Sequence, residues 1–347
     1  MPSGQGAPSG LALQLAYFSG VARLLEARRG GHGAILRLQR VRPEQSARFQ
    51  PLKAREITPE LLERLVRALR RWRFDIVSVE DAVSRVDGPA ARRRFVCLTF
   101  DGAYRDVVAH AYPVLARHDV PFTVYVPTGF VDGIAPMWWL ALQQVIAGHD
   151  RISLVMDRRE RHFDVAEIAD KHDLYGFLAT WMRRLAPAEL SHAINDLCSR
   201  YSVDLATTSR AAAMEWVDLR RLALDARVTI GTATVNYPAL AAMPDAVALR
   251  EMTMGRQVAE AALGRPLPHF AYPFGGPDTA GPREARLAAE AGFGSAVTAQ
   301  AGVVWGRERS HLLALPRISW DGRRPSLRAL RVMLSGIMNS GPAAPSS

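Results

Sequence analysis

The sequence predicts an α/β protein built around a parallel β-sheet. Short apolar runs alternate with amphipathic helical segments, and this alternation returns after a long helical interruption. Strands separated by helical segments are typical of parallel sheets, in which function lies at the strand ends. With 347 residues, of which 48% are hydrophobic and 22% charged, the chain can form one large domain with an insertion or two ordinary domains.

The first half of the chain shows the clearest alternation. Residues 33–43 (GAILRLQRVRP) are expected to form a strand that ends at Pro43. A helix then begins at Thr58-Pro59, since threonine caps a first turn and proline fits the first helical position. The apolar face of this helix consists of Leu61, Leu62, Leu65, Val66 and Leu69. The next segments are predicted as strand, helix, strand, helix and strand: FDIVSV, EDAVSRV, FVCLTF, VVAHAYPVLARH and FTVYV.

From about residue 136 to 224 the alternation stops, and this region is interpreted as a helical insertion. Four segments in it are predicted as helices: MWWLALQQVIAG, AEIADKHDLYGFLATWMRRL, PAELSHAINDLCSRY and MEWVDLRRLAL. The alternation resumes with the strand VTIGT, followed by a helix that Gly264 ends. The remaining expected elements are HFAYPFG, the helix REARLAAEAGF, the strand SAVTA and LPRISWDG.

The chain ends and the composition limit the function classes. Residues 1–32 are expected to form a leader and an amphipathic helix without the features of a secretory signal, and residues 337–347 a disordered tail. The only two cysteines, Cys97 and Cys198, lack a CxxC pattern and indicate a reduced, cytoplasmic protein. No stretch is apolar and long enough for a membrane helix. The net charge of +10 comes from arginines scattered along the chain, so a nucleic-acid groove is not expected, and an acidic lipid or polysaccharide surface fits better.

The stretch TFDGAYRD (residues 99–106) contains the first candidate for chemistry. It follows an apolar run, so Asp101 stands where a buried strand ends. Catalytic carboxylates in α/β proteins often occupy such strand ends. The following residue, Gly102, supplies no side chain. Asp101 therefore has either an acid/base or sugar-binding role, or it accepts backbone hydrogen bonds at a tight strand–helix turn.

Five motifs in this order resemble the NodB-homology family of polysaccharide deacetylases, over residues 33–336. TFDGAYRD stands where that family has TFDDGYRD, and IGTATVNYPAL stands where it has IGSHTVTHPxL. FAYPFGG, EAGFGSAVT and LPRISWDG match with little change. The resemblance implies a distorted (β/α) barrel of about seven strands. The helical insertion at about 136–224 is similar to that of one branch of the family.

The resemblance also implies a reaction, the hydrolysis of N-acetyl groups on amino sugars. In active members one Asp acts as base, while a second Asp and two His hold a divalent metal, commonly zinc, which polarises the amide and activates water. Here Asp101 keeps the base position, whereas Gly102, Ala233 and Tyr237 stand at the three ligand positions. No metal or other cofactor is therefore expected. Gln39 stands where many members have a histidine.

The same resemblance names further candidates for the site. His311, just ahead of LPRI, is the nearest candidate for the general acid. The candidates for binding a saccharide are Tyr104, Tyr272, Pro273, Phe274 and Trp320. Structural roles remain open for several of these side chains: the FAYPFG aromatics could form one wall of the groove, and Trp320 could cover the barrel end. Trp138 and Trp139 either stack on a sugar ring or pack the insertion onto the barrel.

Three functions remain open on these residues. The first is a pseudo-deacetylase that binds a saccharide, or a partner protein of surface-polysaccharide biosynthesis, without hydrolysing it. The second is an active N-deacetylase with a relocated metal or none, in which the single carboxylate would supply general-base help of about 10²–10⁴-fold. The third is a binder of nucleic acid or lipid surfaces driven by charge. The simultaneous loss of all three ligand positions favours the first.

Overall fold

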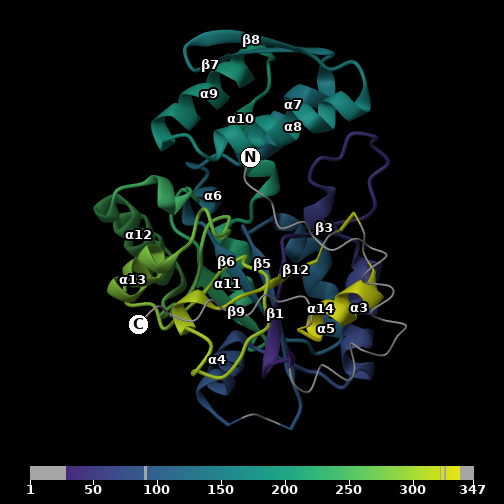
Figure 1. The fold of residues 1–347 in the computed structure, drawn as a ribbon, viewed down its shortest axis with the longest axis vertical. Coiled ribbons are helices and arrows are strands. Elements are labelled where there is room, and N and C mark those ends of the chain that lie inside the picture. Colours follow the sequence, from purple (N-terminus) through teal and green to yellow (C-terminus); the bar gives the residue numbers. More distant parts are fainter. Residues whose placement is uncertain (1–28, 90–91, 321, 324–325, 337–347) are drawn as a thin grey trace.

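A computed structural model of the chain describes residues 29–89, 92–320, 322–323 and 326–336 (Figure 1). The predicted tail, and all but the last residues of the predicted leader and helix at 1–32, lie outside this part of the chain.

The centre of the fold is an eight-stranded sheet with the order β11-β10-β9-β6-β5-β1-β12, and β4 pairs with β5 off this path. The strands are β1 (Gly33–Leu38), β4 (Asp75–Val77), β5 (Phe95–Asp101), β6 (Phe122–Val126), β9 (Val228–Thr232), β10 (His269–Ala271), β11 (Ser295–Val297) and β12 (Ile318–Ser319). All these strands pair in parallel. β5 is buried along its whole length, as its apolar run predicts, so its last residue brings a carboxylate to the end of the sheet.

The segment from residue 315 to 319 brings the two edges of the sheet together. Leu315 forms a parallel bridge with Val297 of β11, and Ile318 pairs with Leu36 of β1. The sheet therefore curls back on itself, and the predicted distorted (β/α) barrel is confirmed. Because all of the strands run in the same direction, their carboxyl ends gather at one rim of this barrel.

Helices cover the outside of the sheet (Figure 1). They are α3 (Pro59–Arg71), α4 (Val79–Asp87), α5 (Tyr112–Arg117), α6 (Thr128–Val131), α11 (Trp216–Ala223), α12 (Asp245–Leu263), α13 (Pro282–Glu290) and α14 (Leu327–Leu334). Short elements in the loops are η1 (Lys53–Arg55), η2 (Val107–Ala111), η3 (Leu240–Ala242), η4 (Leu312–Ala314) and the strand pair β2 (Arg40–Val41) and β3 (Glu56–Ile57). Thr58 caps α3 by accepting a hydrogen bond from Leu61 N, and Gly264 ends α12 at φ 67°, both as predicted.

The insertion forms the lobe at the top of Figure 1. Its helices are α7 (Trp138–Gly148), α8 (Ile168–Met182), α9 (Pro187–Arg200) and α10 (Leu205–Ala212), and it also contains the antiparallel hairpin β7 (Arg151–Met156) and β8 (Arg159–Asp164). The hairpin was not among the elements expected in this helical insertion. Alternate residues of β7 are buried, which is the pattern of a half-buried strand. Asp157 and Arg158 turn the hairpin with φ values of 50° and 64°.

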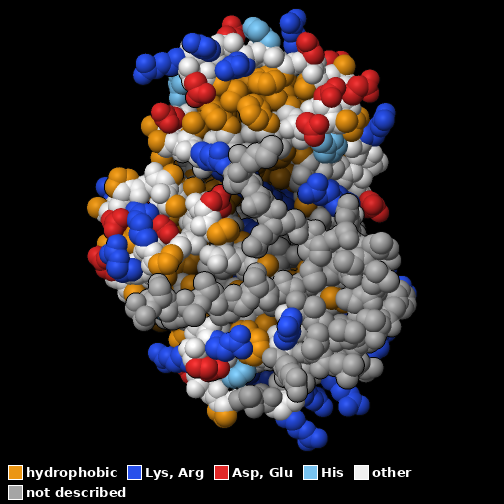
Figure 2. Space-filling model, in the orientation of Figure 1, with side chains coloured by type: hydrophobic (Ala, Val, Ile, Leu, Met, Phe, Trp, Pro, Cys, Tyr) orange, Lys and Arg blue, Asp and Glu red, His pale blue; other side chains and the backbone are white. Residues whose placement is uncertain are grey.

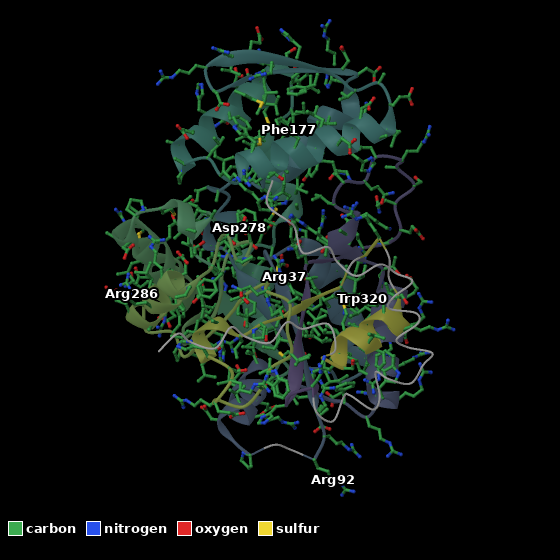
Figure 3. The ribbon with its side chains drawn as sticks, in the orientation of Figure 1. Arg37, Arg92, Phe177, Asp278, Arg286 and Trp320 are labelled. Carbon is green, nitrogen blue, oxygen red and sulfur yellow. The ribbon has the colours of Figure 1, made fainter. Side chains whose placement is uncertain are left out.

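Figure 2 shows that basic and hydrophobic side chains are distributed differently over one face of the molecule. Basic side chains are spread over this face, whereas hydrophobic atoms gather on the insertion, where Phe177 is 51% exposed (Figures 2 and 3). A binder of nucleic acid would be expected to concentrate basic and aromatic side chains in one groove. Among the described residues, no helix has both the length and the apolar character that crossing a membrane requires.

Candidate functional site

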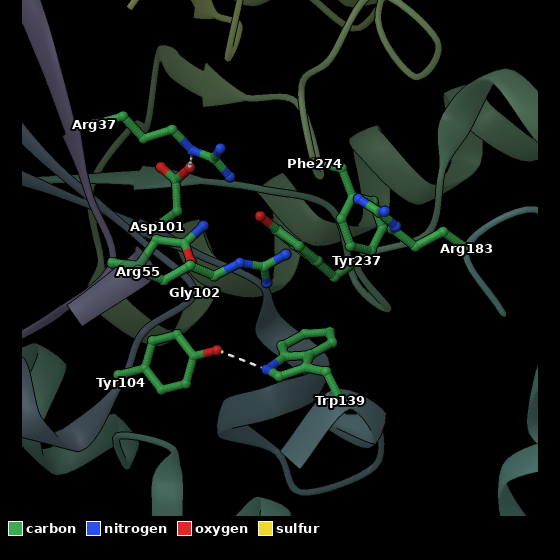
Figure 4. Close-up of a pocket in the computed structure, with 10 residues that line it drawn as sticks. Arg37, Arg55, Asp101, Gly102, Tyr104, Trp139, Arg183, Tyr237 and Phe274 are labelled. Carbon is green, nitrogen blue, oxygen red and sulfur yellow. Dashed lines mark hydrogen bonds and ion pairs between the residues drawn. The ribbon is translucent and has the colours of Figure 1, made fainter. Parts of the chain in front are cut away.

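A small pocket of about 80 Å³ lies where the carboxyl ends of the strands meet the insertion (Figure 4). It is lined by Arg37, Gln39, Arg55, Asp101, Gly102, Tyr104, Trp139, Arg183, Tyr237 and Phe274. The barrel supplies the ends of β1 and β5 and the loops after β5, β9 and β10, while the insertion supplies α7 and the end of α8. The pocket therefore has a floor from the barrel and a wall from the inserted lobe.

The Asp101 carboxylate on the floor of this pocket is held by two guanidinium groups. Arg317 donates from Nη1 to Oδ1 at 2.7 Å and from Nη2 to Oδ2 at 2.8 Å. Arg37 donates from Nε to Oδ2 at 2.6 Å (Figure 4). The Asp101 and Arg317 side chains are 1% and 0% exposed, so the bidentate pair is shielded from water. Both residues that donate hydrogen bonds to Asp101, Arg37 and Arg317, do so through their side chains. Backbone N–H groups at a tight turn, the alternative expected from the sequence, therefore do not hold this carboxylate.

This pairing determines the protonation state of Asp101. Burial alone would raise the pKa of its carboxyl, but the charges and hydrogen bonds of Arg317 and Arg37 outweigh burial and hold the pKa below its usual value. Asp101 is therefore ionised, and both of its oxygens accept hydrogen bonds. A carboxylate in this state accepts a proton less readily than a free one, because protonation would break a shielded ion pair.

The three positions that the resemblance assigns to metal ligands do not fit a divalent cation. Gly102 has φ 99°, and a Cβ added there would lie 2.9 Å from Cε2 of Tyr104. Ala233 is fully buried and has no donor atom in its side chain. Tyr237 supplies a phenol whose pKa is raised, first by burial and then by the Asp101 charge, so the oxygen stays protonated. Zinc prefers thiolate, imidazole and carboxylate ligands.

The rest of the described chain does not replace these ligands. No group of three or more His, Cys, Asp or Glu side chains within it could hold a metal ion. His269, the first residue of β10, lies at the opposite end of the strand from the site, as expected, where its ring contacts Ser295 Oγ at 2.8 Å. Around the pocket the charge is instead carried by arginine, which repels a cation.

An aromatic group forms one side of the pocket. Tyr237 lies with its ring centre 5.2 Å from that of Phe274 and 6.0 Å from that of Trp139. Trp139 Nε1 donates to the Tyr104 hydroxyl at 2.8 Å (Figure 4). Trp139 thus packs the insertion onto the barrel, which is one of the two alternatives that the sequence left open, and it also lines the pocket. Trp138 is buried and does not line the pocket.

Several of the candidates from the sequence lie outside the pocket. Tyr272 is buried in a second core cluster, where its hydroxyl donates to Leu313 O at 2.7 Å. Pro273 and Trp320 do not line the pocket, and Figure 3 shows Trp320 well to one side of Arg37. His311 is an exposed residue that precedes η4, and its Nδ1 accepts a hydrogen bond from Leu313 N. Of the predicted group, Asp101, Gly102, Tyr104, Tyr237 and Phe274 come together.

Sequence reasoning missed the arginines of the site. Arg37 is the one charge in the apolar strand GAILRL, and Arg317 stands between Pro316 and Ile318 in a buried segment. A lone charge inside an apolar strand is a usable signal, because a buried charge needs a partner. Arg55 and Arg183 come from a loop element and a helix end, where no periodic pattern marks them.

Comparisons with known proteins support the barrel fold, and one of them matches the part of the chain that contains the TFDGAYRD motif. The family model described as polysaccharide deacetylase matches residues 88–151, which include Asp101. None of the curated proteins compared with the chain matches it.

Three solved structures share the fold at low sequence identity. The Streptococcus pyogenes deacetylase PplD in complex with acetate is 16% identical with a TM-score of 0.57, over 87% of this chain and 97% of that one. IcaB from Ammonifex degensii is 15% identical with a TM-score of 0.57, over 88% and 98%. The BpsB deacetylase domain from Bordetella bronchiseptica is 17% identical with a TM-score of 0.51, over 84% and 97%. The expected resemblance is confirmed.

Proposed function

We propose that this chain acts as a divergent member of the polysaccharide deacetylase family. It binds a saccharide in surface or exopolysaccharide metabolism and does not hydrolyse it. The observation that carries the proposal is the state of Asp101, whose two oxygens are engaged by Arg317 and Arg37 next to a glycine at the second carboxylate position.

The family's reaction requires groups that this pocket does not supply. Amide hydrolysis needs an activated water and a polarised carbonyl, and the family uses a metal for both tasks. The described residues around Asp101 contain no carboxylate–imidazole set for such a metal. A general base alone contributes about 10²–10⁴-fold, which is small against the barrier to amide hydrolysis. What the pocket retains is a small space lined by aromatic and hydrogen-bonding side chains, which suits binding.

The test measures metal content and acetate release on the full chain. Purified protein is incubated with zinc, dialysed and analysed by mass spectrometry, and then assayed for acetate release from N-acetylglucosamine oligomers beside an active deacetylase as positive control. We expect no bound zinc and no acetate above the blank. Zinc bound at one ion per chain, together with acetate release that a chelator abolishes, would contradict the proposal and establish the alternative of an active hydrolase with a non-standard site.

Two parts of this function remain predictions. A cytoplasmic location is supported by the two cysteines, which are both free and buried. A partner protein from polysaccharide biosynthesis would be sought by co-purification with the full chain.

A further inference from the structure

We infer that the pocket recognises an oxyanion carried on a sugar, either the carboxylate of an acidic sugar or the phosphate of a sugar phosphate. This inference rests on the proposed function and names the class of its ligand. It follows from a reversal of charge: guanidinium groups line the pocket that also contains Gly102 and Tyr237, two of the three positions to which the resemblance assigns metal ligands.

The first step is the count of charges around the pocket. Three guanidinium groups line it, those of Arg37, Arg55 and Arg183, and Asp101 is the single carboxylate among the lining residues. Asp101 is already paired with Arg317 and Arg37, so it does not neutralise the other two arginines. The pocket is therefore positive even after its carboxylate is counted.

The second step is that neither Arg55 nor Arg183 has an acidic partner among the described residues. Neither forms an ion pair with a described residue, and the side chain of Arg55 donates no hydrogen bond to this part of the chain. Arg183 donates from Nε to Ala179 O and from Nη2 to Thr180 Oγ1, which holds its stem against α8 and leaves Nη1 uncommitted. In Figure 4 the two side chains extend toward the pocket from opposite sides.

The third step is that these two charges act on each other. Burial lowers the pKa of the Arg183 guanidinium, and the positive charge of Arg55 lowers it further, while Asp278 acts in the opposite direction. Asp278 is exposed and forms no ion pair with Arg183. Like charges held close together at half-buried positions cost free energy, and an anion between them would offset this cost.

The fourth step is the size of the space. A volume of about 80 Å³ holds about two to three waters, which is enough for a carboxylate or phosphate group but small for a whole sugar ring. The planar guanidinium fork matches both of these oxyanions in two parallel hydrogen bonds. The anionic group would therefore enter the pocket, while the sugar ring remains outside it near Phe274, a lining residue whose side chain is partly exposed.

The test is a titration of the full chain with defined sugars, in buffer with EDTA. The probes are glucuronate, glucose 6-phosphate, inorganic phosphate and neutral N-acetylglucosamine, and binding is followed by calorimetry. We expect one or both anionic sugars to bind at least about tenfold more tightly than the neutral sugar, with affinity falling as salt rises. Preference for glucuronate would assign a carboxylate ligand, and preference for glucose 6-phosphate would assign a phosphate ligand.

Variants connect this binding to the two arginines. Arg55→Gln and Arg183→Gln keep a long polar side chain without charge, and we expect each to weaken anionic-sugar binding by about tenfold. Arg161→Gln removes an exposed arginine on β8, outside the pocket, and should leave the affinity unchanged. Circular dichroism checks that each variant is folded.

Three results would overturn the inference. They are equal binding of the neutral and anionic sugars, no binding of any anionic probe, or anionic binding that Arg55→Gln and Arg183→Gln leave intact. Metal-dependent acetate release would instead overturn the proposed function. Because glucuronate and glucose 6-phosphate have no acetyl group and the titration contains no free metal, the two failures are distinguishable.

Discussion

Replacement of Asp101 by asparagine should destabilise the whole barrel. The change keeps the shape of the side chain but removes its charge, and it turns an amide toward the donors of Arg317 and Arg37. Because the Arg317 side chain is 0% exposed, its charge would stay buried without a counter-ion. Removal of one partner of a buried pair costs about 3–5 kcal/mol. This is a large part of the usual stability of about 5–15 kcal/mol.

Urea unfolding of wild type and Asp101→Asn, followed by tryptophan fluorescence and circular dichroism, measures this loss. A matched control is Asp196→Asn, which removes one of the two acidic partners of Arg200 from a surface pair whose side chains are both 34% exposed. We expect the control to leave the unfolding midpoint almost unchanged. The double variant Asp101→Asn with Arg317→Gln should regain part of the loss, since it removes the uncompensated charge.

A free-energy change below about 1 kcal/mol for Asp101→Asn would refute the reasoning, since values of that size are typical of exposed pairs. The prediction also affects enzymology. An inactive Asp101→Asn protein could not be taken as proof of a catalytic base unless its fold were shown to be intact.

Three further predictions concern the same region and the thiols. Gly102→Asp should destabilise the protein by about 1–3 kcal/mol, because a side chain at φ 99° is strained and its Cβ would press on the Tyr104 ring; an unchanged urea midpoint would contradict this. Because the folded pKa of Asp101 is lowered, the stability from its ion pairs is fully present above the unfolded pKa of about 3.9 and is lost as pH falls through the folded value. The gap between the urea midpoints of wild type and Asp101→Asn should therefore narrow below about pH 4, and a constant gap down to pH 2 would count against the ion pair. Burial raises the pKa of Cys97 and, to about 11, that of Cys198, so a thiol reagent at pH 8 should label neither in the native protein and both in urea; fast native labelling would show that these sites open.

The barrel could be predicted from local rules because its elements obey them. The cap at Thr58, the stop at Gly264 and the apolar run of β5 each specify a short element independently of the rest of the chain. The hairpin in the insertion was missed because β8, RERHFD, is almost entirely exposed and polar. Such a strand has little apolar alternation, and it is defined by its pairing with β7 and by the two positive-φ residues of its turn.

The site was only partly predictable, for a different reason. Asp101, Gly102 and Tyr237 are marked by motifs, so their positions could be compared with those of a family. Arg55 and Arg183 are far apart in the sequence and meet only because the insertion folds over the barrel rim. The positive charge of the pocket arises from that three-dimensional arrangement. It therefore could not be predicted from composition or from the local spacing of residues.

The closing segment of the barrel has a consequence for how the chain is made. The same stretch that joins Leu315 to β11 and Ile318 to β1 also carries Arg317, which lies 216 positions after its partner Asp101. During synthesis, β5 and the Asp101 carboxylate leave the ribosome after Arg37 but long before Arg317, the bidentate partner of this carboxylate. About nine-tenths of the chain must therefore wait, with an open sheet edge and an acid that lacks its bidentate partner, for the closing segment. Shortened chains that end before residue 315 should consequently be poor folders and frequent clients of chaperones.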